Sequence, residues 1–178
     1  MLCLFQDQYL LLQTKFLFAD LGVSHACVRT EDDKIYGWGS NEKNSLGVSA
    51  TTRRIPRPRR VGAYLSKKIE EISCGANFTL ALDAEGNVWG TGSNALGQLG
   101  LGLEGFNATE FRKIPKLGED GGSPARFVAA GEAHGAVLNV YGRVFVFGDN
   151  SKGQLGVEKI QRSSHPIAPE DLPSCVRL

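Results

Sequence analysis

Short apolar runs alternate with turn residues along most of the chain. The run Phe78–Leu82 is followed by the polar turn Asp83–Asn87 and then by a second short run, Val88–Thr91. Apolar runs of this length, bounded by Gly, Asn and Asp, are typical of β-strands rather than helices. Two such runs joined by a turn that contains glycine predict a β-hairpin.

The same hairpin pattern occurs three times, and its glycines keep a constant spacing. In each unit the first glycine stands 17 residues before the second, and the second stands 8 residues before the third. These glycines are Gly22, Gly39 and Gly47, then Gly75, Gly92 and Gly100, then Gly131, Gly148 and Gly156. Because the length varies only between units, the variation is expected in loops. The repeat region is predicted over 15–178, with units near 15–48, 68–102 and 126–157, and residues 1–14 form an N-terminal segment without assignment.

Two proline-containing stretches between the units supply further strands. Arg57–Val61 and Ile114–Leu117 lead to the apolar runs Ile69–Ser73 and Phe127–Ala130. Proline has no N–H to donate, so it suits an outer edge strand. Four strands per unit are the content of one propeller blade. The sequence therefore predicts an all-β fold, a partial β-propeller of about three four-stranded blades.

Most repeated polar and aromatic residues are predicted to be structural. An asparagine follows the second strand of each unit and is expected to bind the backbone of the next turn: Asn41, Asn94 and Asn150. The repeated glycines are expected to let neighbouring backbones approach closely. His25 and His134 stand where Phe78 stands, which favours a packing role over catalysis or metal binding. Blade packing is likewise predicted for the aromatic residues Trp38, Trp89 and Phe147.

These repeats resemble those of the regulator of chromosome condensation family. The resemblance rests on Ile72–Gly75, on Thr79–Leu82, and on the glycine- and asparagine-containing segments Gly92–Gly100 and Gly148–Gly156. It covers roughly residues 15–173. The resemblance implies a seven-bladed propeller, and family members include exchange factors for a small nuclear GTPase, domains of giant ubiquitin ligases, a plant ultraviolet receptor and scaffolds. Seven blades at this repeat length need about 370 residues, so the chain is expected to supply only part of a ring.

The composition excludes several functions and favours none. The chain has 20 basic and 19 acidic residues, so its charge does not demand a nucleic acid or a membrane surface. The four cysteines form no C-x-x-C pair, and reduced, mostly buried thiols in an intracellular protein, cytoplasmic or nuclear, are expected. No catalytic, cofactor-binding or metal-ligating residues are predicted, because no phosphate-binding loop, catalytic triad or ligand spacing stands out.

One charged segment is not explained by the repeat pattern. Five arginines lie within eight residues of a predicted inter-blade loop: Arg53, Arg54, Arg57, Arg59 and Arg60. They could bind an acidic protein face or DNA phosphates. The simpler interpretation is a solvated loop whose charges are balanced by Glu70–Glu71 and Glu31–Asp33. The long Leu103–Pro124 loop is a weaker candidate for a partner.

Three functions are compatible with the sequence. The first is a non-catalytic protein–protein interaction module or scaffold that presents inter-blade loops, including to a chain that completes the propeller. The second is guanine-nucleotide exchange on a small GTPase, alone or as part of a larger factor. The third is chromatin or DNA binding through Arg53–Arg60.

Overall fold

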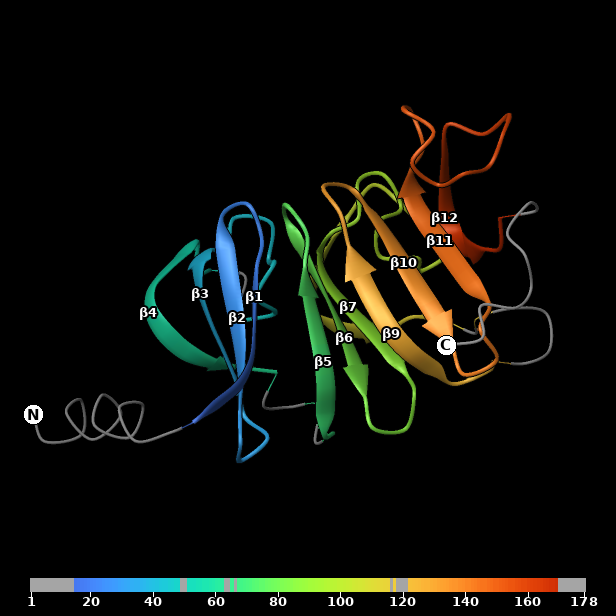
Figure 1. Cartoon of the computed structure of the whole chain (residues 1–178). Helices are drawn as coiled ribbons and strands as arrows, with labels where there is room; N and C mark the ends of the chain where they lie inside the picture. The colour runs from blue at the N-terminus through green and yellow to red at the C-terminus, as the bar shows by residue number, and fades with distance from the viewer. Residues whose placement is uncertain are drawn as a thin grey trace, which may run out of the picture.

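The computed structural model describes residues 15–48, 51–62, 65, 67–115, 117 and 122–169, and the described residues form three four-stranded antiparallel sheets (Figure 1). The first sheet contains β1 (Phe16–Leu21), β2 (His25–Thr30), β3 (Ile35–Ser40) and β4 (Arg54–Val61). The second contains β5 (Ile69–Cys74), β6 (Phe78–Asp83), β7 (Val88–Ser93) and β8 (Asn107–Lys113). The third contains β9 (Ala125–Ala130), β10 (His134–Asn139), β11 (Val144–Asp149) and β12 (Arg162–Ile167). We call these sheets the first, second and third blades, and they confirm the predicted all-β partial propeller.

Within each blade the strands pair in chain order. The central hairpin of every blade closes on a residue with positive φ: Asp33 (59°), Gly86 (79°) and Gly142 (78°). The left-handed conformation is easy for glycine and tolerated by Asp. The substitution of Asp for glycine in the first blade therefore preserves the turn.

The first strands of the blades lie at the inner edge of the arc. Strand β1 contacts β5, and β5 contacts β9, whereas β4, β8 and β12 form the opposite, outer edges. Figure 1 shows the three sheets following one another, with the second blade between the other two. Sheets that meet through their first strands in this way have the arrangement of propeller blades.

Two apolar cores fill the spaces between the blades. The core between the first and second blades contains Leu46, Ile72 and Phe111. The core between the second and third contains Phe78, Leu80 and Phe147, which are fully buried. Every residue of β6 is buried, because the second blade is covered on both faces.

Two local expectations were wrong. The expectation of an inter-blade loop at Arg53–Arg60 was wrong, because the chain from Arg54 onward forms the outer strand β4, but the edge strand predicted at Arg57–Val61 is confirmed as part of it. The expected loop Leu103–Pro124 contains the outer strand β8, and this strand ends before Ile114–Leu117, where the edge strand was predicted. Each blade thus extends to a fourth strand beyond the end of its predicted unit, at Val61, Lys113 and Ile167.

Candidate functional site

The first glycine of each unit lies where neighbouring inner strands come closest. A Cβ atom added at Gly22 would collide with the carbonyl oxygen of Gly75, and one added at Gly75 would lie 2.7 Å from the carbonyl oxygen of Gly131. Each glycine also lies under a ring of its own blade, His25, Phe78 or His134. The equivalence of these rings supports a packing role for the two histidines, and the glycines permit the close approach of the blades.

The repeated asparagines bind the turns that follow them. The Oδ1 atoms of Asn41, Asn94 and Asn150 each accept a hydrogen bond from the backbone N–H of the leucine five residues later, at 3.1, 2.9 and 2.9 Å. Their Nδ2 atoms donate to carbonyl oxygens of the loop that leads to the outer strand. One side chain therefore holds two loop segments together in every blade, and all three are buried.

Another residue, one per blade, ties the central hairpin turn. Asp83 accepts hydrogen bonds from the backbone N–H groups of Glu85 and Asn87 and from Trp89 Nε1 at 2.9 Å. Burial of the Asp83 carboxyl opposes ionisation, but the hydrogen bonds from Trp89, Asn87 and Glu85 outweigh it and lower its pKa below the ordinary value. Asn139 holds the matching turn of the third blade with Oδ1 alone.

Side chains of one inner strand also accept hydrogen bonds from the backbone of the next. Asp20 on β1 accepts from the N–H of Cys74 on β5. Ser73, at the same place in the repeat as Asp20, accepts from the N–H of Ala130 on β9 at 3.0 Å. Glu71 accepts from Val128 N–H, also at 3.0 Å. These bonds link the first blade to the second and the second to the third.

The third blade differs on its uncovered face. Ala129 takes the repeat position of Ser73, and Phe127 takes that of Glu71, so these two positions offer apolar groups in place of acceptors. Phe127 pairs with Leu138 across the strands and is 51% exposed, while Leu138 is half-buried. This face of the third blade is therefore apolar and open among the described residues.

The five arginines predicted from the sequence lie together on the outer side of the first blade. Arg54, Arg57, Arg59 and Arg60 belong to β4, Arg53 directly precedes it, and all five side chains are exposed. Only Ile55 and Val61 of this strand point into the core. The structure thus brings the five guanidinium groups to one outer edge, on a rigid strand rather than a loop.

Three of the five acidic residues expected to balance these arginines have other partners. Asp33 bonds Arg29, and Asp32 bonds Lys34. Glu71 accepts from the third blade as described above. Within the described part of the chain, none of the five arginines forms an ion pair, so their charges face solvent.

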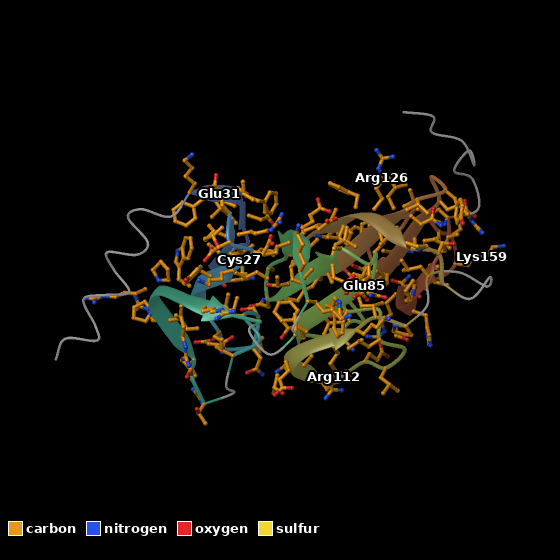
Figure 2. The ribbon with its side chains drawn as sticks, turned by 90° about the horizontal axis from the view of Figure 1, so that it is seen from below. Cys27, Glu31, Glu85, Arg112, Arg126 and Lys159 are labelled. Carbon is orange, nitrogen blue, oxygen red and sulfur yellow. The ribbon has the colours of Figure 1, made fainter. Side chains whose placement is uncertain are left out.

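Sequence analysis missed a cluster of two thiols and one imidazole between the first and second blades. Cys27 on β2 and Cys74 on β5 are both free and buried in the core between these blades, and each alters the pKa of the other. Figure 2 shows Cys27 among the side chains of the blade interior, whereas Glu31, Arg126 and Lys159 lie at the periphery. His25, which lies two residues before Cys27 on β2, contributes its ring to the same cluster. No local spacing could indicate this cluster, because the two cysteines meet only when the blades pack.

The two thiols differ in acidity. The hydrogen bond from Cys27 stabilises a thiolate at Cys74 and, although burial opposes this, the pKa of Cys74 falls to about 6 with a further contribution from His25. The pKa of Cys27 is raised, first by the same hydrogen bond and then by burial. Cys74 is therefore the more acidic and more nucleophilic thiol of the two.

The described residues contain neither a metal-binding cluster nor a membrane-spanning helix. No group of three or more His, Cys, Asp or Glu side chains among them is arranged to hold a metal ion. The described residues also contain no helix that is long and apolar enough to cross a membrane. The structure therefore adds no candidate metal or membrane-spanning site to the surfaces described above.

Comparison with known proteins gives consistent matches. The sequence pattern described as the regulator of chromosome condensation (RCC1) repeat matches residues 32–82 and 141–177, and a second pattern of that description matches 69–98 and 126–154. The human X-linked retinitis pigmentosa GTPase regulator is 35% identical over 153 residues, which are 82% of this chain and 14% of that protein. Human protein RCC2 is 35% identical over 133 residues, 75% of this chain and 24% of that protein. The chain thus spans a quarter or less of these two relatives.

Solved structures with the same fold are also longer than this chain. Human WBSCR16 superposes with a TM-score of 0.74 at 24% identity, over 88% of this chain and 38% of that one. Yeast RCC1 (Prp20), in its complex with Kap60, superposes with a TM-score of 0.77 at 21% identity, over 91% and 39%. These likenesses establish the blade architecture, and the sequence matches establish the family. The chain belongs to the regulator of chromosome condensation (RCC1) repeat family.

Proposed function

We propose that this chain is a non-catalytic protein-interaction module whose partner-binding surface is the outer strand β4 with its exposed arginines, and that the partner presents an acidic segment. The observation that carries the proposal is the set of five exposed arginines without an ion pair among the described residues. An edge of unpaired guanidinium groups attracts carboxylates and can bind them in bidentate geometry. The rigid sheet behind β4 holds these groups in place before binding.

The backbone of β4 argues for recognition through side chains. Pro56 and Pro58 lie within the strand and have no N–H to donate. A partner strand could not form a regular ladder along such an edge. Binding through the arginine side chains therefore fits this edge better than addition of a strand.

The overall charge favours a protein partner over DNA. The chain carries a net charge of +1, with 19 acidic residues among 20 basic ones. Domains that bind the phosphate backbone are commonly much more basic. A short acidic peptide needs only the local cluster on β4, whereas a duplex extends over the rest of the chain, where 19 acidic residues face the remaining 15 basic ones (20 less the five arginines).

The test is binding of a fluorescein-labelled polyglutamate peptide and of a short DNA duplex, measured by anisotropy at two salt concentrations. Replacing the five arginines with Gln is expected to weaken peptide binding roughly tenfold or more. The matched control replaces five exposed basic residues outside β4 that form no ion pair within the described part of the chain: Lys15, Lys43, Arg126, Lys152 and Lys159. The control lowers the net charge equally and should keep most of the binding.

Two results would oppose the proposal. Equal losses in the two variants would mean that net charge, rather than β4, drives binding. Tighter binding of the duplex than of the peptide, with a steep salt dependence that disappears in the β4 variant, would favour the nucleic-acid alternative. Thermal unfolding of both variants establishes that the blades are intact.

Guanine-nucleotide exchange is a second candidate, because one relative with 35% identity is named a GTPase regulator. The chain covers 14% of that relative, so the activity comes to this chain only as a proposal. Release of a fluorescent guanine nucleotide from a small GTPase, with and without the chain, tests it. No acceleration at saturating chain would leave the interaction module as the proposed function.

A further inference from the structure

We propose that Cys74 and Cys27 form a peroxide-reactive dithiol site, in which Cys74 is oxidised first and Cys27 then closes a disulfide between the first and second blades. The site does not depend on the arginine strand or on any partner. The proposal rests on the position of the two thiols, on the groups around Cys74 and on a path from solvent.

Two neighbouring blades hold the thiols together. Cys27 takes the repeat position that Leu80 fills in the second blade, so its sulfur points into the space between blades. Asp20 is paired with Cys27 across β1 and β2, and its carboxylate accepts the backbone N–H of Cys74. This bond holds β5 beside β2, and both thiols lie in the same apolar core between the first and second blades.

The His25 ring has a defined orientation beside Cys74. The Thr79 hydroxyl donates its proton to the Ser45 carbonyl at 2.7 Å, so at 2.8 Å it accepts from His25 Nε2. His25 Nδ1 is buried and has no hydrogen-bond partner among the described residues. A buried, unpartnered ring nitrogen beside a thiol is an uncommon arrangement, because buried polar atoms are usually satisfied.

The surroundings favour a thiolate at Cys74. The hydrogen bond from Cys27 and the interaction with His25 lower the pKa of Cys74, against the effects of burial and of the Asp20 charge. The thiolate is the form that reacts with peroxides, and a nearby second thiol resolves the product. Cys27, whose pKa is raised, remains a thiol and can supply the proton that the first step requires.

A hollow at the inner edge of the blades adjoins Cys74, and we expect a small oxidant to approach through it. Cys74 lines a hollow of about 380 Å³ between the ends of the inner strands, together with residues of β1, β5, β9 and the turns that follow them. The Cys74 residue is only 5% exposed, and Cys27 is 1% exposed. This access suits hydrogen peroxide, which is small and uncharged, better than a bulky disulfide such as oxidised glutathione.

The reaction consumes one hydrogen peroxide. The Cys74 thiolate attacks one peroxide oxygen, the O–O bond breaks, and the departing hydroxide takes a proton to become water, which leaves a sulfenic acid on Cys74. The Cys27 thiolate then attacks the Cys74 sulfur, the S–O bond breaks, and the departing hydroxide takes from solvent the proton that Cys74 released on ionising, which makes a second water. Two thiols are oxidised to one disulfide, and the peroxide is reduced to two waters.

The experiment treats the full chain with hydrogen peroxide at pH 7 and quenches it into denaturant with dimedone before intact-mass and peptide mass spectrometry. Cys3→Ser and Cys175→Ser are present in every protein, so that Cys27 and Cys74 are the remaining thiols of the four. The parent should lose the mass of two hydrogen atoms and yield a Cys27–Cys74 linked peptide. Added Cys27→Ser should give a dimedone adduct on Cys74 at a level roughly tenfold above the parent.

Two further variants separate a specific site from a merely structural pair. Cys27→Ala removes the hydrogen-bond donor that Cys27→Ser keeps, so Cys74 should be oxidised several-fold more slowly in the alanine variant than in the serine variant. Cys74→Ser should abolish oxidation of Cys27. Equal rates in the Ala and Ser variants, oxidation of Cys27 in the absence of Cys74, or a disulfide only between two chains would each overturn the proposal. Near-ultraviolet circular dichroism of each variant shows whether the blades are folded.

Discussion

At the scale of single residues, one position per blade performs the same task with different side chains. Thr30, Asp83 and Asn139 each tie the turn of the central hairpin. Asp83 has the largest set of partners, because its second oxygen also accepts from Trp89 Nε1. All three blades of this chain thus have a side-chain oxygen that accepts hydrogen bonds at this position, and only the second blade has a charged residue, Asp83, there.

Replacing Asp83 with Asn should destabilise the chain by about 1–2 kcal/mol at pH 7, because Oδ1 can still hold the turn but the acceptor for Trp89 is lost. The substitution copies the third blade, where Asn139 holds the turn, so the hairpin itself should survive. Urea unfolding at pH 7, followed by tryptophan fluorescence, measures the change. A variant as stable as the parent would show that the bond to Trp89 contributes nothing.

The same variant should also change the response to acid. The folded-state pKa of Asp83 is lowered relative to its usual value. Its carboxylate therefore contributes stability that is present above the unfolded pKa, about 4, and is lost as the pH falls through the folded value. The gap in unfolding free energy between parent and variant should accordingly be constant from pH 7 to 5 and shrink below pH 4.

Residue roles fixed by local backbone conformation were open to prediction. Asp33 has a φ of 59°, as expected for a residue that replaces a turn glycine, and Asn44 has a φ of 64° where the other units have Gly97 and Gly153. The hydrogen bond from Leu99 N–H to Asn94 Oδ1 could also be predicted, since donor and acceptor lie in one turn. The bond between Asp83 and Trp89 was not predicted, because it depends on where the second strand places its ring.

At the scale of the strands, the three inner strands are not equivalent. The backbone of β5 is enclosed between β1 and β9, whereas β9 has a neighbour on one side only among the described residues. Gly75 therefore faces both the buried Phe78 ring and the carbonyl oxygen of Gly131, while the three atoms nearest to a Cβ at Gly131 all belong to the half-buried His134 ring. A side chain at the end of a strand can move aside more easily than backbone.

Gly75→Ala should consequently destabilise the chain by about 3 kcal/mol, at the upper end for overpacking of a well-packed site. Gly131→Ala is the matched control and should cost about 1 kcal/mol or less, since His134 can rotate towards solvent. Thermal unfolding of the two variants measures the difference. Equal losses would mean that contact within a blade, rather than between blades, decides the cost.

The outer strands, which have few apolar residues, were predicted least well: the start of β4 was missed, and β8 was placed too late in the sequence. Only Ile55 and Val61 of β4 and only Ala108 and Phe111 of β8 are buried. An outer strand packs one narrow face and leaves the rest in solvent, so its alternation is interrupted by charges and prolines. The inner strands and the central hairpins, buried more completely, carried the pattern that predicted the fold.

At the scale of the whole molecule, the two faces at the ends of the arc set how the chain meets others. The third blade presents Phe127, Ala129 and Leu138 on a face that no described residue covers. A contiguous apolar patch of this kind favours association. The thiol cluster belongs to this scale too, because Cys27 and Cys74 meet only through the packing of two blades, and no local sequence signal could have revealed it.

The chain should therefore exceed its monomer mass of 19.2 kDa in light scattering as its concentration rises. Phe127→Lys should return the mass towards that of the monomer, since it places a charge in the apolar face. Tyr141→Lys is the control, because Tyr141 is exposed on the turn between β10 and β11. A constant monomer mass at all concentrations would show that this face does not drive association.

The prolines of the outer strands also oppose amyloid-like aggregation through the sheet edges. Pro56 and Pro58 interrupt the free edge of the first blade, and Pro166 lies in the outer strand of the third. An amyloid-like stack grows by continuous backbone pairing at an exposed edge, and proline stops such growth. Fibril seeding from β4 is thus opposed while its edge faces solvent, and the edge of β12 is partly covered as well, since Ser164 O accepts from Gly102 N–H at 2.8 Å. A nascent chain could expose these two edges throughout synthesis without templating a cross-β aggregate.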